Sequence, residues 1–257
     1  MDLGLAGRRA IVTGGSRGIG RAIAAALLAE GVQVVIAARG EDQLKVATAQ
    51  LSVDGGVVVP VVTDTGSDES VQNLVARTVS ELGGVDILVN NAARVGGPGG
   101  PGGVRAVTTE DAAADFNVKV LGYLRAAQEV IPHLVAQKWG RIINVGGLAA
   151  RQVGLVGGSI RNAGIVALTK TLADELGPHG ITVNAVHPGA TRTDQHDGTL
   201  SLTDEQYAAL GGRVAIGRVV TADEVAAVVA FLASPVAAAV TGESIAAGGG
   251  TPGPIHY

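Results

Sequence analysis

Hydrophobic positions along the chain form short continuous runs, and longer segments with apolar residues at helical spacing separate them. The runs are rich in β-branched residues, which is typical of strands covered on both faces of a parallel sheet. They predict strands at 9–15, 32–39, 56–62, 86–92, 140–147 and 180–188. The amphipathic segments predict helices at 18–30, 41–52, 67–82, 109–137, 160–177 and 222–233.

This regular alternation of strand and helix predicts an α/β fold with right-handed crossovers. With one further strand near the C-terminus, we expect a Rossmann fold: a doubly wound parallel sheet of about seven strands with helices on both faces. No linker or change of composition divides the sequence, so residues 1–257 are interpreted as a single domain.

Two segments depart from this alternation. "VGGPGGPGGV" (95–104) is too rich in glycine and proline for a regular element and predicts a loop after the fourth strand. The polar segment at about 190–213 follows the sixth strand and is interpreted as a lid. Both would project from the carboxyl edge of the sheet, where ligands bind in folds of this kind.

The composition favours a large buried core and excludes several classes of function. Hydrophobic residues make up 47% of the chain and charged residues 16%, which is too apolar for a disordered protein. A net charge of −4 without a basic run gives no sign of nucleic-acid binding. The lack of cysteine, and of His, Asp and Glu at ligand spacing, predicts no disulfide and no metal site. Without a signal peptide or a membrane-length apolar run, we expect a cytoplasmic protein that does not enter a membrane.

A glycine-rich turn, "VTGGSRGIG" (12–20), joins the first predicted strand to the first helix. Its glycines allow a tight bend that brings backbone N–H groups to a pyrophosphate at the helix N-terminus. The spacing is G-x-x-x-G-x-G rather than the commoner G-x-G-x-x-G, and the alternative is a turn needed only for packing. The residues predicted to hold the nucleotide here are Gly14, Ser16, Arg17, Gly18, Ile19 and Gly20.

The end of the second strand bears on the choice between NAD(H) and NADP(H). A site for NAD usually has an acidic side chain there for the ribose 2′-hydroxyl, but this chain has Ala38 followed by Arg39. Arg17 lies in the glycine turn, and two guanidinium groups without a carboxylate suit a 2′-phosphate. The sequence therefore favours NADP(H), and the alternative is a pair of solvated surface arginines.

Further motifs follow in a fixed order and extend over nearly the whole chain. They are Asp64, "NNAA" (90–93), Asn117, "GRIINV" (140–145), "LTKTLADELG" (168–177), "ITVNAVHPGATRT" (181–193) and "TGESIAAGGG" (241–250). With "TGGSRGIG" (13–20), they resemble the short-chain dehydrogenase/reductase family, whose members usually reduce carbonyls or oxidise alcohols.

The resemblance implies roles for residues beyond the glycine turn. Asp64 and Thr65 would approach the adenine, and Asn90 and Ala92 would line the cofactor cleft. Residues near the nicotinamide amide would be Pro188, Gly189, Thr191 and Thr193. The resemblance also implies a homodimer or homotetramer that uses the helices at 109–137 and 160–177 and the C-terminal strand.

The usual reactive residues of the family are a Ser, a Tyr and a Lys four residues after that Tyr, supported by an Asn. Aligned without gaps, the chain has Gly147 at the Ser position, Gly158 at the Tyr position and Asn162 at the Lys position. Asn117 is retained. The tyrosines Tyr123, Tyr207 and Tyr257 are not expected near the helix that carries Gly158.

Other side chains are candidates for the missing chemistry. Ser159 flanks the vacated position, Arg161 could stabilise an oxyanion, and Asn162 could bond to the nicotinamide ribose. His187 lies at the carboxyl edge and can titrate near neutrality; the alternative is a histidine bonded to backbone. Arg151 and Gln152, in the loop after the fifth strand, are candidates for a substrate contact, and the alternative is plain loop polarity. Weaker candidates, from the lid or the C-terminus, are His196, Tyr207, His256 and Tyr257.

Three hypotheses remain. The first is an NADP(H)-dependent oxidoreductase with an altered active site, acting on a small carbonyl or alcohol, or on an activated enone or imine. The second is a catalytically inactive NADP(H)-binding protein, or a non-catalytic partner subunit that forms a hetero-oligomer with an active family member. The third is a non-redox enzyme on the same scaffold, against which Arg17 and Arg39 argue.

Overall fold

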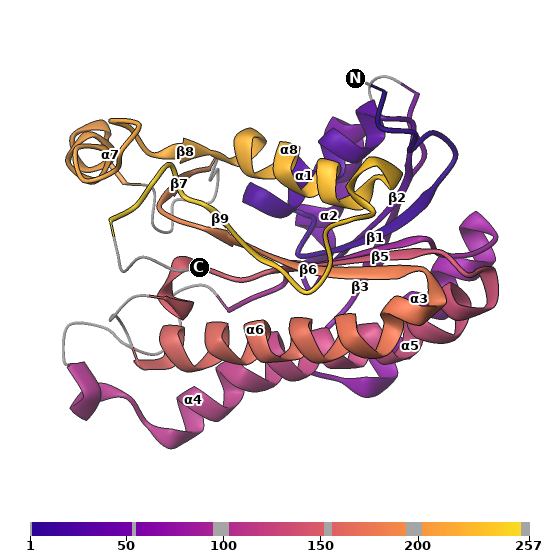
Figure 1. Cartoon of the computed structure of the whole chain (residues 1–257), viewed down its shortest axis with the longest axis horizontal. Helices are drawn as coiled ribbons and strands as arrows, with labels where there is room; N and C mark the ends of the chain where they lie inside the picture. The colour runs from indigo at the N-terminus through magenta and orange to yellow at the C-terminus, as the bar shows by residue number, and fades with distance from the viewer. Residues whose placement is uncertain (1, 53–54, 95–102, 152–155, 194–201, 253–257) are drawn as a thin grey trace.

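One parallel sheet organises the molecule (Figure 1). The computed structural model describes residues 2–52, 55–94, 103–151, 156–193 and 202–252. Seven strands pair in the order β3-β2-β1-β4-β5-β6-β9, which confirms the doubly wound parallel sheet. They are β1 (Arg9–Thr13), β2 (Gln33–Ala38), β3 (Val58–Val62), β4 (Ile87–Asn90), β5 (Gly140–Val145), β6 (Ile181–Pro188) and β9 (Ser244–Ala247).

Helices cover both faces of this sheet, as predicted (Figure 1). One layer contains α1 (Gly18–Ala29), α2 (Glu41–Leu51) and α8 (Ala222–Ala233). The other contains α3 (Asp68–Leu82), α5 (Gly122–Gln137) and α6 (Val156–Leu176), with α4 (Thr109–Phe116) beside α6. A separate apolar cluster fills the space between the sheet and each layer, so burial on both faces explains the continuous hydrophobic strands.

Local signals in the sequence set several helix ends. The Ser67 side chain accepts a hydrogen bond from the backbone N–H of Ser70 at the start of α3. Thr221 and Glu224 form a capping box at the start of α8, which confirms Thr221 as the residue preceding that helix. Gly83 ends α3 at φ 78°, a left-handed conformation that glycine adopts without a side-chain clash.

The predicted helix at 109–137 is interrupted. α4 ends at Phe116, residues Asn117–Leu121 form a π-helical turn, and α5 begins at Gly122. A π turn widens the helix and displaces the side chains that follow, and such turns are frequent at functional sites. Asn117, which the resemblance aligns with the usual supporting Asn, begins this turn.

The predicted loop and lid are described only in part. The loop at 95–104 has residues 95–102 outside the described ranges, and Gly103–Ala106 form a short 3-10 turn. In the segment at 190–213, residues 194–201 lie outside them. The rest forms β7 (Thr191–Arg192), which pairs in parallel with β8 (Val220–Thr221), and α7 (Asp204–Gly211). The role of this segment as a lid stays a prediction.

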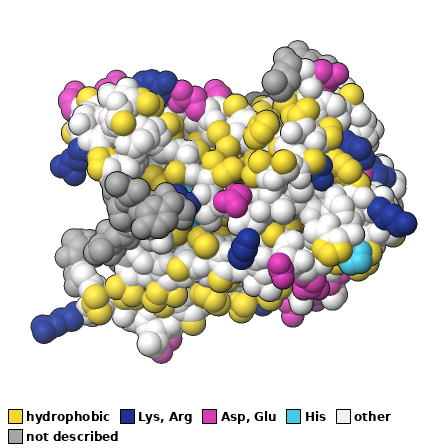
Figure 2. Space-filling model, viewed as in Figure 1, with side chains coloured by type: hydrophobic (Ala, Val, Ile, Leu, Met, Phe, Trp, Pro, Cys, Tyr) yellow, Lys and Arg dark blue, Asp and Glu magenta, His cyan; other side chains and the backbone are white. Residues whose placement is uncertain are grey.

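Some apolar side chains remain at the surface of the helical layers (Figure 2). They gather over α6, where Ile160 is 55% exposed, and over α8, where Phe231 is 39% exposed. Of these two helices, α6 includes nearly all of the segment at 160–177 that the resemblance implies for contacts between subunits.

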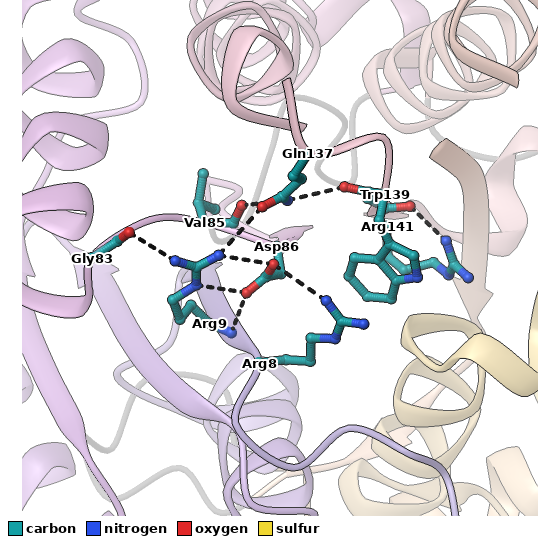
Figure 3. Close-up of polar contacts among 9 residues, drawn as sticks. Arg8, Arg9, Gly83, Val85, Asp86, Gln137, Trp139 and Arg141 are labelled. Atoms are coloured by element: carbon teal, nitrogen blue, oxygen red, sulfur yellow. Dashed lines mark hydrogen bonds and ion pairs between the residues drawn. The ribbon is translucent and has the colours of Figure 1, made fainter. Parts of the chain in front are cut away.

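Charged side chains contact one another at the amino edge of the sheet (Figure 3). Asp86, before β4, accepts hydrogen bonds from the backbone N–H of Arg9 at 2.9 Å and from its Nε at 2.7 Å. The Arg8 guanidinium stacks 3.8 Å from the Trp139 ring centroid, and Arg141 lies 4.5 Å from it. Burial, and then the neighbouring Arg8, lowers the pKa of Arg141 to about 10. These contacts join the starts of β1, β4 and β5.

We expect Asp86→Asn to lower the free energy of unfolding by about 3 kcal/mol, because it leaves the Arg9 charge without its buried partner. Urea unfolding measures the change through the midpoint at an unchanged slope. Glu81→Gln is the control: it removes the exposed Arg77–Glu81 pair and should change stability by less than about 0.5 kcal/mol. Equal effects of the two substitutions would contradict a structural role for Asp86.

Candidate nucleotide cleft and active site

A cleft of about 420 Å³ opens at the carboxyl edge of the sheet, where the strand order reverses between β1 and β4. This is the position at which doubly wound folds bind nucleotides. Its lining includes most of the residues predicted for the nucleotide. They are Gly14, Ser16, Arg17, Gly18, Ile19, Gly20, Arg39, Asp64, Thr65, Ala92 and Thr193.

The glycines of the turn are required by close contacts. Gly14 has φ +66° and Gly18 has φ +52°, conformations that L side chains rarely adopt. A Cβ atom on Gly20 would lie 2.1 Å from the Gly14 carbonyl oxygen, so the start of α1 packs directly on the turn. Without side chains there, the cleft is left open for phosphate groups beside the N-terminus of α1. The residues present therefore fit a dinucleotide.

Hydrogen bonds join the turn to the end of β4. The Thr13 hydroxyl accepts from the backbone N–H groups of Asn91 and Ala92, at 2.9 and 3.1 Å. The Asn91 side-chain amide donates to the carbonyl oxygens of Thr13 and Gly14, at 3.1 and 3.2 Å. Asn91 thus fixes one wall of the cleft, although the sequence analysis did not select it.

Asn90 is a correction to the predicted lining. Its side chain is buried and donates to Asn144 Oδ1 at 3.0 Å, and Asn144 in turn donates to the Thr169 hydroxyl. Asn90 therefore faces the core between β4 and β5, and the next residue, Asn91, lines the cleft in its place.

The adenosine side of the cleft combines positive side chains with backbone and hydroxyl groups. Arg17 and Arg39 both line it, and Gln43 of α2 lies against Gly40 at its rim. Asp64 Oδ1 accepts from the backbone N–H of Gly66 at 2.9 Å, and the Thr65 hydroxyl donates to the Val118 carbonyl oxygen at 3.0 Å. These bonds fix the loop after β3 at the cleft, and an adenine contact of Asp64 and Thr65 stays a prediction.

The Asn117 side chain forms hydrogen bonds within the protein, and a catalytic role for it stays a prediction. Its Oδ1 accepts from Arg125 Nη2 at 2.8 Å, and its Nδ2 donates to the Gly66 carbonyl oxygen at 3.3 Å. Arg125 also pairs with Asp68 at the start of α3. The side chain of Asn117 therefore links the π turn to the loop that bounds the adenosine side.

His187, at the end of β6, is completely buried. Its Nδ1 lies 3.1 Å from the backbone nitrogen of Gly147, and its Nε2 lies 3.3 Å from the Ser244 hydroxyl oxygen. The pKa of His187 is lowered to about 4, mainly by burial and in smaller part by the charges of Arg151 and Lys119. A backbone hydrogen bond with Gly147 opposes this shift. The expectation that His187 titrates near neutrality is therefore wrong, because its neutral form is favoured by burial.

Arg161 is engaged by a carboxylate. Its Nη1 donates to both oxygens of Asp115, at 2.8 and 2.7 Å, and joins α6 to α4. The Asp115 side chain is 1% exposed, so this pair is largely buried. Ser159, two residues earlier on α6, is half-buried. A contact of Arg161 or Ser159 with substrate stays a prediction.

Lys119 is a further candidate that the sequence analysis missed. It lies in the π turn, is 4% exposed, and donates from Nζ to the Gly146 carbonyl oxygen at 3.0 Å. Burial and then the Arg161 charge lower the pKa of Lys119 to about 7, against the opposing effect of Asp115. The signal in the sequence is a lysine inside the otherwise apolar stretch "VKVLGY", two residues after Asn117.

Tyr123 lies nearer to α6 than the sequence suggested. It packs in a buried cluster with Val120 and Ile165, the latter on α6. Its hydroxyl donates to the Val145 carbonyl oxygen at 2.9 Å, and burial raises the pKa of this phenol far above its ordinary value. Tyr123 is therefore a structural neighbour of the site and not an available proton donor.

The other predicted residues are placed as follows. Pro188 ends β6, Gly189 and Thr191 follow it at the same edge, and Arg151 donates to the Ser244 carbonyl oxygen. Tyr207 of α7 stacks with Arg192 at 5.1 Å. Gln152, His196, His256 and Tyr257 lie outside the described residues. Within the described ranges, no group of three or more His, Asp or Glu side chains could hold a metal ion. The helices described there include none with the length and hydropathy that a bilayer crossing requires.

Comparison with known proteins agrees with this geometry. The profile of the family described as enoyl-(acyl carrier protein) reductase matches residues 14–251. The chain is 35% identical over 250 residues to 3-oxoacyl-[acyl-carrier-protein] reductase FabG of Vibrio cholerae, covering 96% of this chain and 98% of that protein. It is 35% identical over 260 residues to short-chain reductase protein NovJ of Streptomyces niveus, covering 95% and 93%.

Solved structures show the same architecture. YwfH, an NADPH-dependent reductase involved in bacilysin biosynthesis, superposes with a TM-score of 0.87 at 29% identity, covering 96% of this chain and 99% of that chain. A dehydrogenase/reductase from Sinorhizobium meliloti superposes with a TM-score of 0.84 at 34% identity, covering 95% of each chain.

The burial of Lys119 predicts a pH dependence of stability. Because the unfolded lysine holds its proton up to about pH 10.5 and the buried one only to about pH 7, the folded form gains stability as the pH rises between these values. We expect the free energy of unfolding of the natural protein to rise relative to that of Lys119→Met, by about 1 kcal/mol or more from pH 7.5 to about pH 9. Urea unfolding at each pH measures it.

Lys45→Met is the control for this prediction, because Lys45 lies on the surface of α2 in an exposed pair with Glu41. Its stability difference from the natural protein should not change over the same pH range. A constant difference for Lys119→Met as well would contradict the lowered pKa of the buried amine.

Proposed function

The chain belongs to the short-chain dehydrogenase/reductase family, and from that premise we propose that it is an NADP(H)-dependent oxidoreductase with an altered active site. The observation that carries the proposal is the cleft at the β1–β4 switch, with its glycine turn and two lining arginines. When bound, the cofactor would supply or accept a hydride at its nicotinamide ring.

The residues of the cleft suit particular parts of that cofactor. The backbone of the glycine turn would hold the pyrophosphate beside α1, and Asp64 and Thr65 would hold the adenine. Arg17 and Arg39 would bind the 2′-phosphate through charge-assisted hydrogen bonds, since the end of β2 offers Ala38 and no carboxylate. NADP(H) is therefore proposed over NAD(H), and the YwfH relative, named as NADPH-dependent, supports this choice.

The proposed alteration concerns the residues that move the proton. We align Gly147, Gly158 and Asn162 with the Ser, Tyr and Lys that family members usually use. Positioned acid–base catalysis raises the rate about 10²–10⁴-fold, so a site without the phenol loses a rate factor of that size. A small carbonyl compound is one proposed substrate, and an enone or imine is another, because an activated electrophile depends less on a proton donor.

The preference for NADP(H) is tested by titration calorimetry with each coenzyme. We expect Arg39→Met to weaken NADPH binding about tenfold or more and to leave NADH binding nearly unchanged, because the guanidinium would contact the 2′-phosphate. Arg21→Met is the matched control: Arg21 lies on α1 outside this cleft lining and bonds to Gln50. No detectable binding of either coenzyme by the natural protein would refute the proposed function.

Turnover is tested separately by single-turnover loss of NADPH absorbance. The probes are an acetoacetyl thioester, cyclohexenone and the cyclic imine pyrroline, which represent the three proposed electrophiles. Oxidation of NADPH with any of them supports an oxidoreductase. Tight NADPH binding without oxidation by any probe would count against it and favour the second candidate, a non-catalytic nucleotide-binding subunit.

The observation that favours this second candidate is the absence of side chains at Gly147 and Gly158. Such a subunit would assemble with an active family member in a hetero-oligomer, whereas the enzyme would form a homodimer or homotetramer. The apolar side chains over α6 and α8 are the proposed contact surfaces in both cases (Figure 2). Co-purification from the source organism separates the two, since a second chain would be recovered only with the hetero-oligomer.

A further inference from the structure

The side chain of Asn162 lies beside Gly147 and Gly158, and one of its polar atoms has no hydrogen-bond partner among the described residues. Asn162 is 3% exposed, its Nδ2 donates to the Gly158 carbonyl oxygen at 2.8 Å, and its Oδ1 accepts no hydrogen bond from the described residues. A Cβ atom on Gly147 would lie 3.1 Å from Asn162 Nδ2, so the two residues face one another directly. A buried acceptor of this kind is costly unless a ligand supplies its donor.

Lys119 of the π turn also approaches Gly147. Its Nζ donates to the carbonyl oxygen of Gly146, which shares a peptide bond with Gly147. His187 approaches the same peptide from β6, with Nδ1 3.1 Å from the Gly147 nitrogen. The lysine from the π turn, the amide from α6 and the imidazole from β6 therefore converge on one peptide group.

Within the described ranges, no carboxylate forms a direct ion pair with Lys119. The charge of Asp115 raises the pKa of Lys119, but both oxygens of Asp115 accept from Arg161. Arg161 repels the ammonium, and His187 is neutral at physiological pH. Among the described residues, the buried ammonium of Lys119 has one hydrogen bond, so Lys119 lowers the stability of the fold relative to an apolar side chain. Packing therefore does not explain why a lysine occupies this position.

We propose that Lys119 is the proton donor of the active site, in place of the tyrosine that α6 lacks. This inference rests on the proposed function, because it needs a nicotinamide cofactor and a reducible substrate. The ammonium comes from the π turn and lies at the Gly146 carbonyl oxygen, next to Gly147 and the Asn162 side chain that contacts it. Asn162 Oδ1 would accept a hydrogen bond from the cofactor ribose or from the substrate.

The proposed step balances. When bound, the reduced cofactor would supply a hydride to the carbonyl carbon of the substrate, and the C=O π electrons would move to the oxygen. A proton passes from Lys119 Nζ to that oxygen, which gives an alcohol, oxidised cofactor and a neutral amine. Solvent then returns a proton to the amine. At physiological pH, an amine with a pKa of about 7 is present in similar amounts as the ammonium and as the free amine. It can therefore donate a proton to the substrate and take one back from solvent.

Kinetics of the natural protein and two variants test the proposal, with the acetoacetyl thioester as probe. We expect the single-turnover rate of the natural protein to fall as the pH rises through about 7, because the donor must be protonated. Lys119→Met should lower the rate about 10²-fold and remove this dependence. Lys119→Arg keeps the positive charge but cannot release a proton near neutrality, so it should be equally slow.

A rate of Lys119→Met equal to that of the natural protein, with the same pH profile, would refute the role of Lys119 and leave the oxidoreductase in place. Full activity of Lys119→Arg would also refute it, since charge alone would then suffice. Lys45→Met is the matched control and should retain both rate and profile. NADPH binding to both Lys119 variants should be within about twofold of normal, because Lys119 is outside the adenosine lining.

A second measurement needs neither turnover nor a stable variant. In protein with isotopically labelled lysine side chains, the one buried amine should titrate near pH 7, apart from the surface lysines, and its signal should shift on addition of oxidised NADP⁺. Titration of every lysine near pH 10.5 would refute the proposal, as would a Lys119 signal unchanged by saturating NADP⁺. Either result is independent of whether any probe is reduced.

Discussion

The hydrogen bonds between Thr13 and Asn91 are the constraint on which the nucleotide cleft depends. They tie the end of β1 to the end of β4, the two strands between which the direction of winding reverses. The same asparagine amide reaches the Gly14 carbonyl oxygen and thereby fixes the glycine turn in position. Because Thr13 is fully buried, this junction is rigid, and α1 can start directly against the turn at Gly20.

Most of the fold is readable from the sequence because strands buried on both faces leave a simple hydrophobic signal. The run at 56–62 illustrates the limit: β3 begins only at Val58 and lies at the edge of the sheet, with Val62 exposed. The continuous helix predicted at 109–137 also differs from the structure. Amphipathic spacing is nearly the same across a single π turn, so periodicity alone cannot reveal the interruption at Asn117–Leu121.

The residues of the site were harder to predict where tertiary packing decides the role. Asn90 and Asn91 are adjacent, and the residue at which β4 ends determines which one turns to the core and which to the cleft. A lysine in a helix is usually solvated, so burial of Lys119 follows only from tertiary packing, in which the π turn contacts α6 and Nζ reaches the Gly146 carbonyl oxygen after β5. His187 and Tyr123 were assessed by sequence position, whereas burial determines the pKa of each.

The two edges of the sheet use polar groups in opposite ways. At the amino edge, Asp86 is surrounded by donors from Arg9, and the contacts in Figure 3 join neighbouring strands. At the carboxyl edge, Asn162 Oδ1 lacks a donor among the described residues and Lys119 has a carbonyl in place of a carboxylate. Polar groups that are satisfied within the protein stabilise the fold, and those left incompletely satisfied are the ones that a bound cofactor and substrate can complete.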